Sequence, residues 1–430
     1  MSKIFCDDVK LTPYWWDNVP RPELPSLPAP AKADVVVIGS GYTGLSAALQ
    51  TARGGRDTVV LDVEDAGWGC STRNGGQISI SVKPPYAELA QRHGAQRAAA
   101  IIREGQNSLA WIEEFVAQEG IDCNFRIAGR FHAAHSPAAY EALARQITAR
   151  PNELAIEAHM ITRAGQRSEL GTDAYFGGVV YPRHASVDPA RLHQGMLERA
   201  MAAGARVIPH CPALQVQRET NGFLIDVHGG RIATRQVVVA TNGYTGNITP
   251  SLQRRVIPIG SYIIATEPIA PELMARLMPK DRVVSDTRKV VYYYRASPDR
   301  RRILFGGRVS YNETDPRKSG PKLRAEMTRV FPELAGVTIS HSWAGLVAYT
   351  FDELVHTGTQ DGLFYSAGYC GSGVGMAGYL GMRLGQKVLG LKEGKTAFDG
   401  LPFRTRPFYT GRPWFMGPVL MYYRWMDRLG

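Results

Sequence analysis

The chain has 430 residues, 44% of them hydrophobic, and a formal net charge of +11. This length predicts one large domain or two interleaved domains with a sizeable core. No apolar run of about 18 residues exists to span a membrane, and no apolar leader predicts secretion, so we expect a cytoplasmic protein. The arginines are scattered and no nucleic-acid-binding module is evident, which leaves an anionic cofactor or acidic substrate to match the positive charge.

The five cysteines form no C-x-x-C pair and their number is odd. This pattern predicts reduced thiols, with no disulfide framework and no metal site.

Residues 1–33 predict an extended arm, because five prolines lie between positions 20 and 30. Ahead of the prolines stands Tyr14-Trp15-Trp16. Large aromatics near a terminus more often anchor an arm to the protein's own surface than bind a ligand, and we expect that here.

An apolar strand over residues 34–38 runs into Gly39-x-Gly41-x-x-Gly44. This pattern predicts a tight turn at Gly39, a close backbone approach to a pyrophosphate at Gly41, and a helix packed on the strand at Gly44. A second strand, residues 58–61, ends at Asp62, where a carboxylate would bind a ribose hydroxyl. An ordinary βαβ unit whose glycines only serve packing is the alternative.

The middle of the chain alternates helical and strand-like patterns around a glycine-rich loop at 67–77. Helices are expected at 86–118 and 137–149 and from Pro189 onward, with Asp188 as N-cap. A strand is expected within 123–135, a hairpin over 214–227 that turns at Asn221-Gly222, and a buried strand at 237–241. Residues 256–312 alternate in strand fashion and predict an antiparallel sheet.

A second glycine turn follows the strand-like residues 363–367 and opens a helix that ends near residue 389. Two glycine turns at helix N-termini, far apart in sequence, suit one extended ligand with a phosphate end and another polar end.

Five motifs together resemble the D-amino-acid oxidase class of FAD-dependent oxidoreductases, over about residues 14 to 428. They are GSGYTG (39–44), STRNGGQ (71–77), VDP (187–189), VVVATNG (237–243) and AGYCGSGVGMA (367–377). The STRNGG loop, Trp343-Ala344-Gly345 and the aromatic arm are most similar to the γ-glutamylputrescine oxidase branch, and iminodiacetate oxidase is similar in type.

The resemblance implies an α/β fold, in which a Rossmann-like FAD-binding domain carries an inserted, mostly antiparallel substrate-domain sheet. The FAD domain is expected at 34–120, 170–252 and 338–405, the substrate domain at 121–169 and 253–337, and a C-terminal segment at 406–430.

The resemblance also implies the cofactor contacts, from the pyrophosphate at the first turn to the flavin's pyrimidine edge at the second. Asp62 would hold the ribose and the Val216 backbone the adenine. The implied FAD-binding residues are Gly39, Gly41, Tyr42, Thr43, Gly44, Asp62, Ser71, Thr72, Arg73, Asn74, Gly75, Gly76, Val216, Ala240, Thr241, Gly371, Ser372, Gly373, Val374 and Gly375.

The sequence departs from sarcosine-oxidase-type relatives at two places. A cysteine joins the flavin covalently in those enzymes, but residues 343–352 contain none, so we expect noncovalent FAD. Their basic pair that clamps a substrate carboxylate would fall near Gly76 and Gly375, so a different clamp, or none, is needed.

Candidate substrate-positioning residues are Arg308, which could pair with a carboxylate, and Tyr262, Tyr293 and Trp343, which could line the pocket. A structural salt bridge and core packing are their alternatives. His341 and His356 are candidates for proton handling, although a lone histidine is more often a structural hydrogen-bonding group. The C-terminal segment, rich in aromatics and arginine, could lie in a membrane interface, but packing back on the FAD domain is favoured.

The resemblance implies FAD-dependent oxidation of a secondary amine or N-substituted amino acid, with iminodiacetate, N-alkylglycines and γ-glutamylputrescine as candidates. Hydride transfer to flavin N5 and imine hydrolysis would give an aldehyde or keto acid and a smaller amine, and O2 would reoxidise the flavin to give H2O2. The alternatives are a dehydrogenase that uses another acceptor such as quinone, a flavin-binding subunit without amine oxidase activity, and a nicotinamide enzyme.

Overall fold

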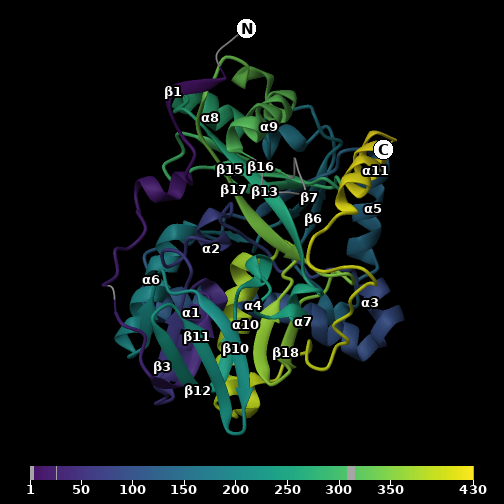
Figure 1. Cartoon of the computed structure of the whole chain (residues 1–430). Helices are drawn as coiled ribbons and strands as arrows, with labels where there is room; N and C mark the ends of the chain where they lie inside the picture. The colour runs from purple at the N-terminus through teal and green to yellow at the C-terminus, as the bar shows by residue number, and fades with distance from the viewer. Residues whose placement is uncertain (1–3, 26, 308–314, 430) are drawn as a thin grey trace.

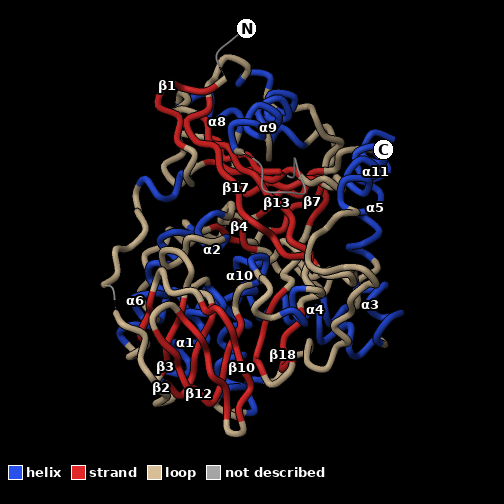
Figure 2. The backbone as a smooth tube through the Cα atoms, in the orientation of Figure 1, coloured by secondary structure: helices blue, strands red, loops and turns tan. Residues whose placement is uncertain are grey.

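The computed structural model describes residues 4–25, 27–307 and 315–429. Two large sheets dominate it (Figure 1). Figure 2 shows one sheet, with β1, β17, β13 and β7, toward the N-terminus at the top, and the other, with β2, β3, β12 and β10, at the bottom among helices. This arrangement confirms the predicted α/β fold with two interleaved sheets.

The lower sheet has eight strands and a parallel centre. β2 pairs in parallel with β3 and β12, and β3 with β9, while β10, β11 and β12 form an antiparallel meander. Its strands are β10 (Ala213–Glu219), β11 (Gly222–Val227), β12 (Gly230–Val239), β2 (Lys32–Ile38), β3 (Thr58–Leu61) and β9 (Arg206–Ile208), with β19 (Leu363–Ala367) beside β12 and β18 (His356–Gln360) beside β19. β3 is buried along its whole length, and the apolar ends of β2 (35–38) and β12 (237–239) are buried as well, as expected where both faces of a sheet are covered.

Helices α1 (Tyr42–Arg53) and α10 (Gly373–Val388) follow the two predicted glycine turns and pack against each other. A Cβ at Gly381 would lie 2.4 Å from the Thr43 carbonyl oxygen, and one at Gly385 would lie 2.8 Å from that of Ala47. The glycines of α10 therefore allow close contact between the two helices, which brings their N-termini to the same place.

The helices predicted at 137–149 and from Pro189 onward form, whereas those at 70–73, 250–253, 271–277, 316–330 and 416–429 were not predicted, and the one at 271–277 lies within the range expected to be strands. The predicted helix over 86–118 is broken into α3 (Tyr86–His93) and α4 (Ala95–Gln118) by Gly94, whose φ of +80° favours glycine. The other helices are α2 (Cys70–Arg73), α5 (Pro137–Thr148), α6 (Pro189–Ala202), α7 (Pro250–Gln253), α8 (Pro271–Leu277), α9 (Pro316–Val330) and α11 (Met416–Leu429).

Asp188 caps α6 as predicted, accepting the backbone N–H of Ala190 and of Arg191 at 2.9 and 3.1 Å. The predicted hairpin forms between β10 and β11, with its turn one residue earlier than expected, because Gly222 already pairs with Glu219.

The upper sheet has nine strands and is mostly antiparallel, as predicted; only β1–β17 and β5–β14 pair in parallel. Three of its strands, β1, β7 and β17, lie outside the ranges expected for the substrate domain. In sheet order the strands are β1 (Phe5–Lys10), β17 (Ile339–Tyr349), β13 (Ile257–Thr266), β16 (Ile303–Gly307), β15 (Tyr292–Ala296), β14 (Val283–Asp286), β5 (Arg130–Ala133), β7 (Gly178–Tyr181) and β6 (His159–Ile161).

Helices α8 and α9 cover one face of this sheet and bury an apolar cluster against it. A short ribbon of β4 (Gln77–Ile78) and β8 (Ala185–Ser186) lies between the two large sheets (Figure 2). Within the described residues, no helix combines the length and the apolarity that crossing a bilayer requires.

Candidate active site at the two glycine turns

A cavity of about 590 Å³ opens where the carboxyl ends of β2, β3 and β12 meet the N-termini of α1 and α10. In open α/β sheets, ligands bind at this edge. The cavity brings together twelve of the residues implied to bind FAD: Gly39, Gly41, Tyr42, Thr43, Asp62, Ser71, Asn74, Ala240, Thr241, Gly371, Gly373 and Val374.

The first glycine turn has no room for side chains. Gly39 has a φ of +104°, and a Cβ on Gly44 would lie 1.8 Å from the Gly39 carbonyl oxygen. A Cβ on Gly41 would lie 2.8 Å from the Ser71 hydroxyl oxygen, which accepts the N–H of Tyr42 at 3.0 Å. These approaches bring the backbone at the start of α1 to the cavity wall, and a helix N-terminus suits a pyrophosphate.

Asp62 ends β3 and faces the cavity, as predicted. Its carboxylate accepts the Ser40 N–H at 2.8 Å and the Glu64 N–H at 3.1 Å, which fixes its orientation. The nearby wall is formed by Ala213 and Leu214 rather than by Val216, which does not line the cavity. β10 starts at the cavity edge and carries Val216 away from it, paired with Ile225 of β11.

The second glycine turn is tied to the first. The Tyr369 and Thr43 hydroxyls are 2.6 Å apart, and the Asn242 side-chain oxygen accepts the Gly368 N–H at 3.0 Å. Burial raises the pKa of Tyr369 to about 12, so its hydroxyl stays protonated. The Ser372 hydroxyl, expected at the flavin, instead donates to the Ser81 carbonyl at 2.8 Å.

Three indole N–H groups hold the loop at residues 72–74, between the two large sheets. Two of the indoles come from the N-terminal arm and one from β17, and all three distances are 2.9 Å. Trp15 donates to the Asn74 carbonyl, Trp16 to the Thr72 hydroxyl and Trp343 to the Arg73 carbonyl. The arm thus packs on the protein's own surface, as expected, and Trp343 supports the loop.

Arg73 is likewise a structural residue of this loop. Its guanidinium lies 4.1 Å from the centre of the Trp68 ring and 4.8 Å from that of Trp16, and it donates to the carbonyls of Trp68 and Ala344. The side chain faces the aromatic arm, and Arg73 does not line the cavity.

Gly75, Gly76 and Gly375 also lie outside the lining of the cavity. A Cβ on Gly76 would lie 2.2 Å from the Val187 carbonyl oxygen, and one on Gly375 would lie 3.2 Å from the Ile78 side chain. Gly76 and Gly375, near which the resemblance would put a basic pair, are therefore packed against other parts of this protein.

The candidate substrate-positioning residues lie on different faces of the upper sheet. Tyr262 is fully buried and joins the core beneath α9, on the far side from the arm tryptophans. Tyr293 faces the other way, with its ring over Gly75 and its hydroxyl 2.8 Å from that of Ser261. Arg308 lies outside the described residues.

The two candidate histidines have structural partners. His341 lies 3.0 Å from the Asp17 carboxylate of the arm, and His356 lies 3.1 Å from that of Asp352. Neither lines the cavity. Their positions agree with the structural alternative.

Several lining residues were missed by the sequence analysis: Val63, Trp68, Tyr244, Val347 and Tyr369. The Tyr244 hydroxyl accepts the Leu346 N–H at 3.2 Å, and its ring meets that of Trp68 edge-on. Tyr244 directly follows the predicted strand and its Ala-Thr-Asn-Gly end, and Tyr369 lies inside the second glycine turn, so both could have been found by position.

The residues of the cavity fit FAD. Two helix N-termini and a row of glycines suit an anionic pyrophosphate and the electron-rich edge of a flavin, and Asp62 suits a ribose. Among the described lining residues, Asp62 and Glu64 are the only charged ones, and both belong to the β3 end.

The sequence matches the family model described as FAD dependent oxidoreductase over residues 34–387. It is 31% identical to γ-glutamylputrescine oxidoreductase of Escherichia coli (strain K12), covering 92% of this chain and 93% of that protein. It is 30% identical to the probable oxidoreductase OrdL of Rhizobium meliloti (strain 1021), covering 93% and 96%.

Solved structures agree at the level of the fold. Glycine oxidase from Geobacillus kaustophilus superposes with a TM-score of 0.73 at 18% identity, covering 88% of this chain and 99% of that one. Iminodiacetate oxidase from Chelativorans sp. BNC1 superposes with a TM-score of 0.66 at 20% identity, covering 83% and 95%. With the family model matched over most of its length, the chain belongs to the D-amino-acid-oxidase-type family of FAD-dependent oxidoreductases.

Proposed function

We propose that this FAD-dependent oxidoreductase oxidises an extended amine of the γ-glutamylputrescine type, whose reacting carbon carries no carboxylate. The main support is the absence of any cationic side chain among the described residues of the cavity wall. Gly76 and Gly375, near which sarcosine-oxidase-type relatives would carry a basic pair, have no side chain to bind a carboxylate, which also supports the proposal. The similarity to γ-glutamylputrescine oxidoreductase over nearly the whole chain points the same way.

The chain's own residues would position the reactants. Bound FAD supplies the hydride acceptor for the carbon next to the amine nitrogen. The N–H groups that begin α10 would stabilise negative charge on the reduced ring, and Val347 and Tyr244 would exclude water. No described residue is needed as an acid or base if the amine binds in its neutral form.

The substrate proposal is tested by steady-state kinetics with γ-glutamylputrescine, iminodiacetate and sarcosine. We expect kcat/KM for γ-glutamylputrescine, whose carboxylate is far from the reacting amine, to exceed by roughly tenfold or more that for the two secondary amines, whose nitrogen is one carbon away from a carboxylate. A preference for iminodiacetate or sarcosine would show that a carboxylate one carbon from the reacting amine nitrogen is recognised, and would overturn the proposal.

We also propose that FAD is bound noncovalently. Cys70 and Cys211 line the cavity. Burial raises the pKa of the Cys70 thiol to about 11 and also raises that of Cys211, so both are protonated and weakly nucleophilic. Acid precipitation of the holoenzyme should leave all flavin in the supernatant, whereas a yellow pellet would contradict this.

We propose O2 as the electron acceptor, which is supported by two structural neighbours being named oxidases. A peroxidase-coupled assay should detect one H2O2 per amine oxidised. Turnover with an artificial quinone but not with O2 would favour the dehydrogenase alternative.

A further inference from the structure

An apolar surface is exposed on the C-terminal segment. The described residues include eleven exposed large hydrophobic side chains, and six of them lie in this one segment. These six form what we call the C-terminal surface: Phe408, Trp414, Met421, Tyr422, Trp425 and Met426. Scattered single apolar residues are normal on a protein surface, but a cluster of this kind marks an interaction site.

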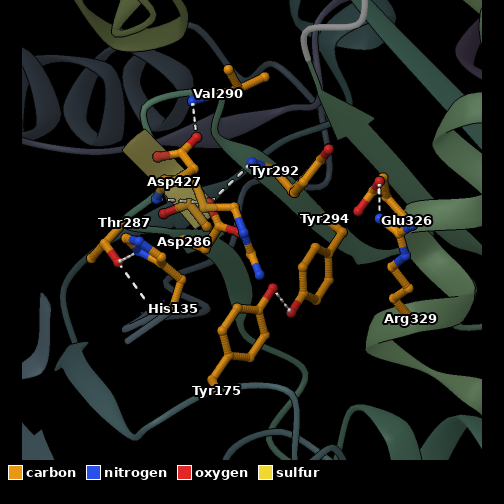
Figure 3. A network of polar contacts seen from close by, with 12 residues as sticks. His135, Tyr175, Asp286, Thr287, Val290, Tyr292, Tyr294, Glu326, Arg329 and Asp427 are labelled. Atoms are coloured by element: carbon orange, nitrogen blue, oxygen red, sulfur yellow. Dashed lines mark hydrogen bonds and ion pairs between the residues drawn. The ribbon is translucent and has the colours of Figure 1, made fainter. Parts of the chain in front are cut away.

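The inner face of α11 is firmly attached, so the exposed face is not the result of a loose helix. Met416 and Leu420 are buried in an apolar cluster with β13 and β17 residues. The Asp427 carboxylate accepts the backbone N–H of Lys289 at 2.7 Å and that of Val290 at 3.0 Å (Figure 3). The segment therefore packs back on the protein through one face only. Its contacts are not confined to the expected FAD-domain ranges, since β13 and residues 289–290 belong to the range expected for the substrate domain.

Among the described side chains of α11, the outer face is apolar as well. Met421 and Trp425 are four residues apart, as are Tyr422 and Met426, so they share one side of the helix. Trp425 is 56% exposed and Met421 67% exposed. A surface helix of a globular protein normally has a polar outer face, and a helix that is apolar on both faces is normally covered.

The charge around this surface is positive. From residue 400 to residue 426 the sequence contains four arginines and no Asp or Glu. Arg404, Arg406 and Arg412 are exposed. Asp427, the next acid along the chain, is already engaged by backbone N–H groups. The partner that covers this surface should therefore be both apolar and anionic.

We propose that the C-terminal surface docks the protein on an anionic lipid bilayer, with α11 lying in the plane of the interface. Tryptophan, tyrosine and methionine side chains would enter the boundary between headgroups and acyl chains, while the arginines contact lipid phosphates. A second copy of the chain fits less well, because symmetric pairing would place the two sets of arginines against each other.

The test is co-sedimentation of the FAD-loaded full chain with vesicles. The protein should bind vesicles of phosphatidylglycerol and phosphatidylcholine, bind pure phosphatidylcholine much more weakly, and dissociate at high salt. Met421→Ser with Trp425→Ser should reduce binding on the order of tenfold or more, because both side chains lose apolar burial. Leu391→Ser, at an exposed residue outside this surface, is the matched control and should bind like the parent.

Flavin content and amine turnover without vesicles should be unchanged in the double variant, since neither residue lines the cavity. The proposal is overturned if the intact holoenzyme does not bind anionic vesicles, or if the double variant binds them as well as the parent. It is also overturned if analytical ultracentrifugation reveals a dimer that the double variant dissolves, because a second copy would then cover the surface.

Discussion

At the scale of single residues, the site depends on positions where a side chain is absent. Gly41 leaves open the space beside Ser71 that a pyrophosphate must approach, and Gly44 lets α1 begin against the turn. The side chains that do matter, such as Asp62 and Tyr369, are held by hydrogen bonds inside the protein. Hydrogen bonds within the protein thus fix the orientation of these lining side chains.

Gly41→Val should abolish FAD retention. The added side chain would meet the Ser71 hydroxyl and occupy the phosphate end of the cavity. Flavin absorbance per protein after gel filtration measures the effect, and Gly336→Val is the control, since a Cβ at Gly336 meets no atom within 4 Å. Stoichiometric flavin in the Gly41 variant would contradict the assignment of this turn.

A second prediction concerns His193, which contacts the Ser40 carbonyl at 2.8 Å beneath the first glycine turn. Burial, together with the nearby Arg21, lowers the pKa of His193 from 6.5 to about 3. Between these two pH values the unfolded chain holds a proton at this position that the folded protein does not. Lowering the pH through this window therefore favours unfolding.

Urea unfolding at pH 7 and pH 5 should show a larger loss of stability for the wild type than for His193→Gln. The expected difference is about 2 kcal/mol, from the proton taken up by the unfolded state. The same pH dependence in both proteins would show that His193 is not the group that titrates.

At the scale of secondary-structure elements, the N-terminal arm belongs to the site although it does not line the cavity. Its short helix, Tyr14–Asp17, supplies two of the indoles that hold residues 72–74. Cys70, Ser71 and Asn74 on the same loop form part of the cavity wall. The arm can therefore affect FAD binding without touching it.

Trp16→Phe keeps an aromatic side chain, although a smaller one, and removes the indole N–H that donates to Thr72. One such bond contributes about 1 kcal/mol, so the dissociation constant for FAD should rise roughly fivefold. Fluorescence titration of apoprotein with FAD measures it. The control is Trp414→Phe, whose indole is exposed and distant from this loop. Equal FAD affinities for the Trp16 variant and the wild type would show that Trp16 does not position the loop at residues 72–74 for FAD binding.

Elements set by local signals could be predicted from the sequence. Asp188-Pro189 begins a helix and the glycine turns begin α1 and α10, because caps and turns depend on neighbouring residues. The break at Gly94 was missed, since an exposed glycine does not reveal its φ. Tyr262 was expected to line the pocket, but its side chain points into the core of the upper sheet. The alternation of a strand predicts two faces, but it does not predict which part of the protein each face packs against.

At the scale of the whole molecule, the cavity depends on contacts between distant parts of the chain. β1 pairs with β17, and Trp343 of β17 reaches the loop at residue 73. Such pairings have no local signal, so the sequence could predict two interleaved sheets but not that β1, β7 and β17 join the upper one. Of the residues implied by the family motifs, those of the two glycine turns and Asp62 mostly line the cavity, whereas Val216, Arg73, Gly76 and Gly375 do not.

The central claim, oxidation of an amine at this FAD site, is tested most directly by anaerobic titration of the purified holoenzyme with γ-glutamylputrescine while the flavin spectrum is recorded. The account predicts that the oxidised flavin band disappears with one equivalent of amine and returns when O2 is admitted. A flavin band that persists through the titration with γ-glutamylputrescine, iminodiacetate and sarcosine alike would contradict it.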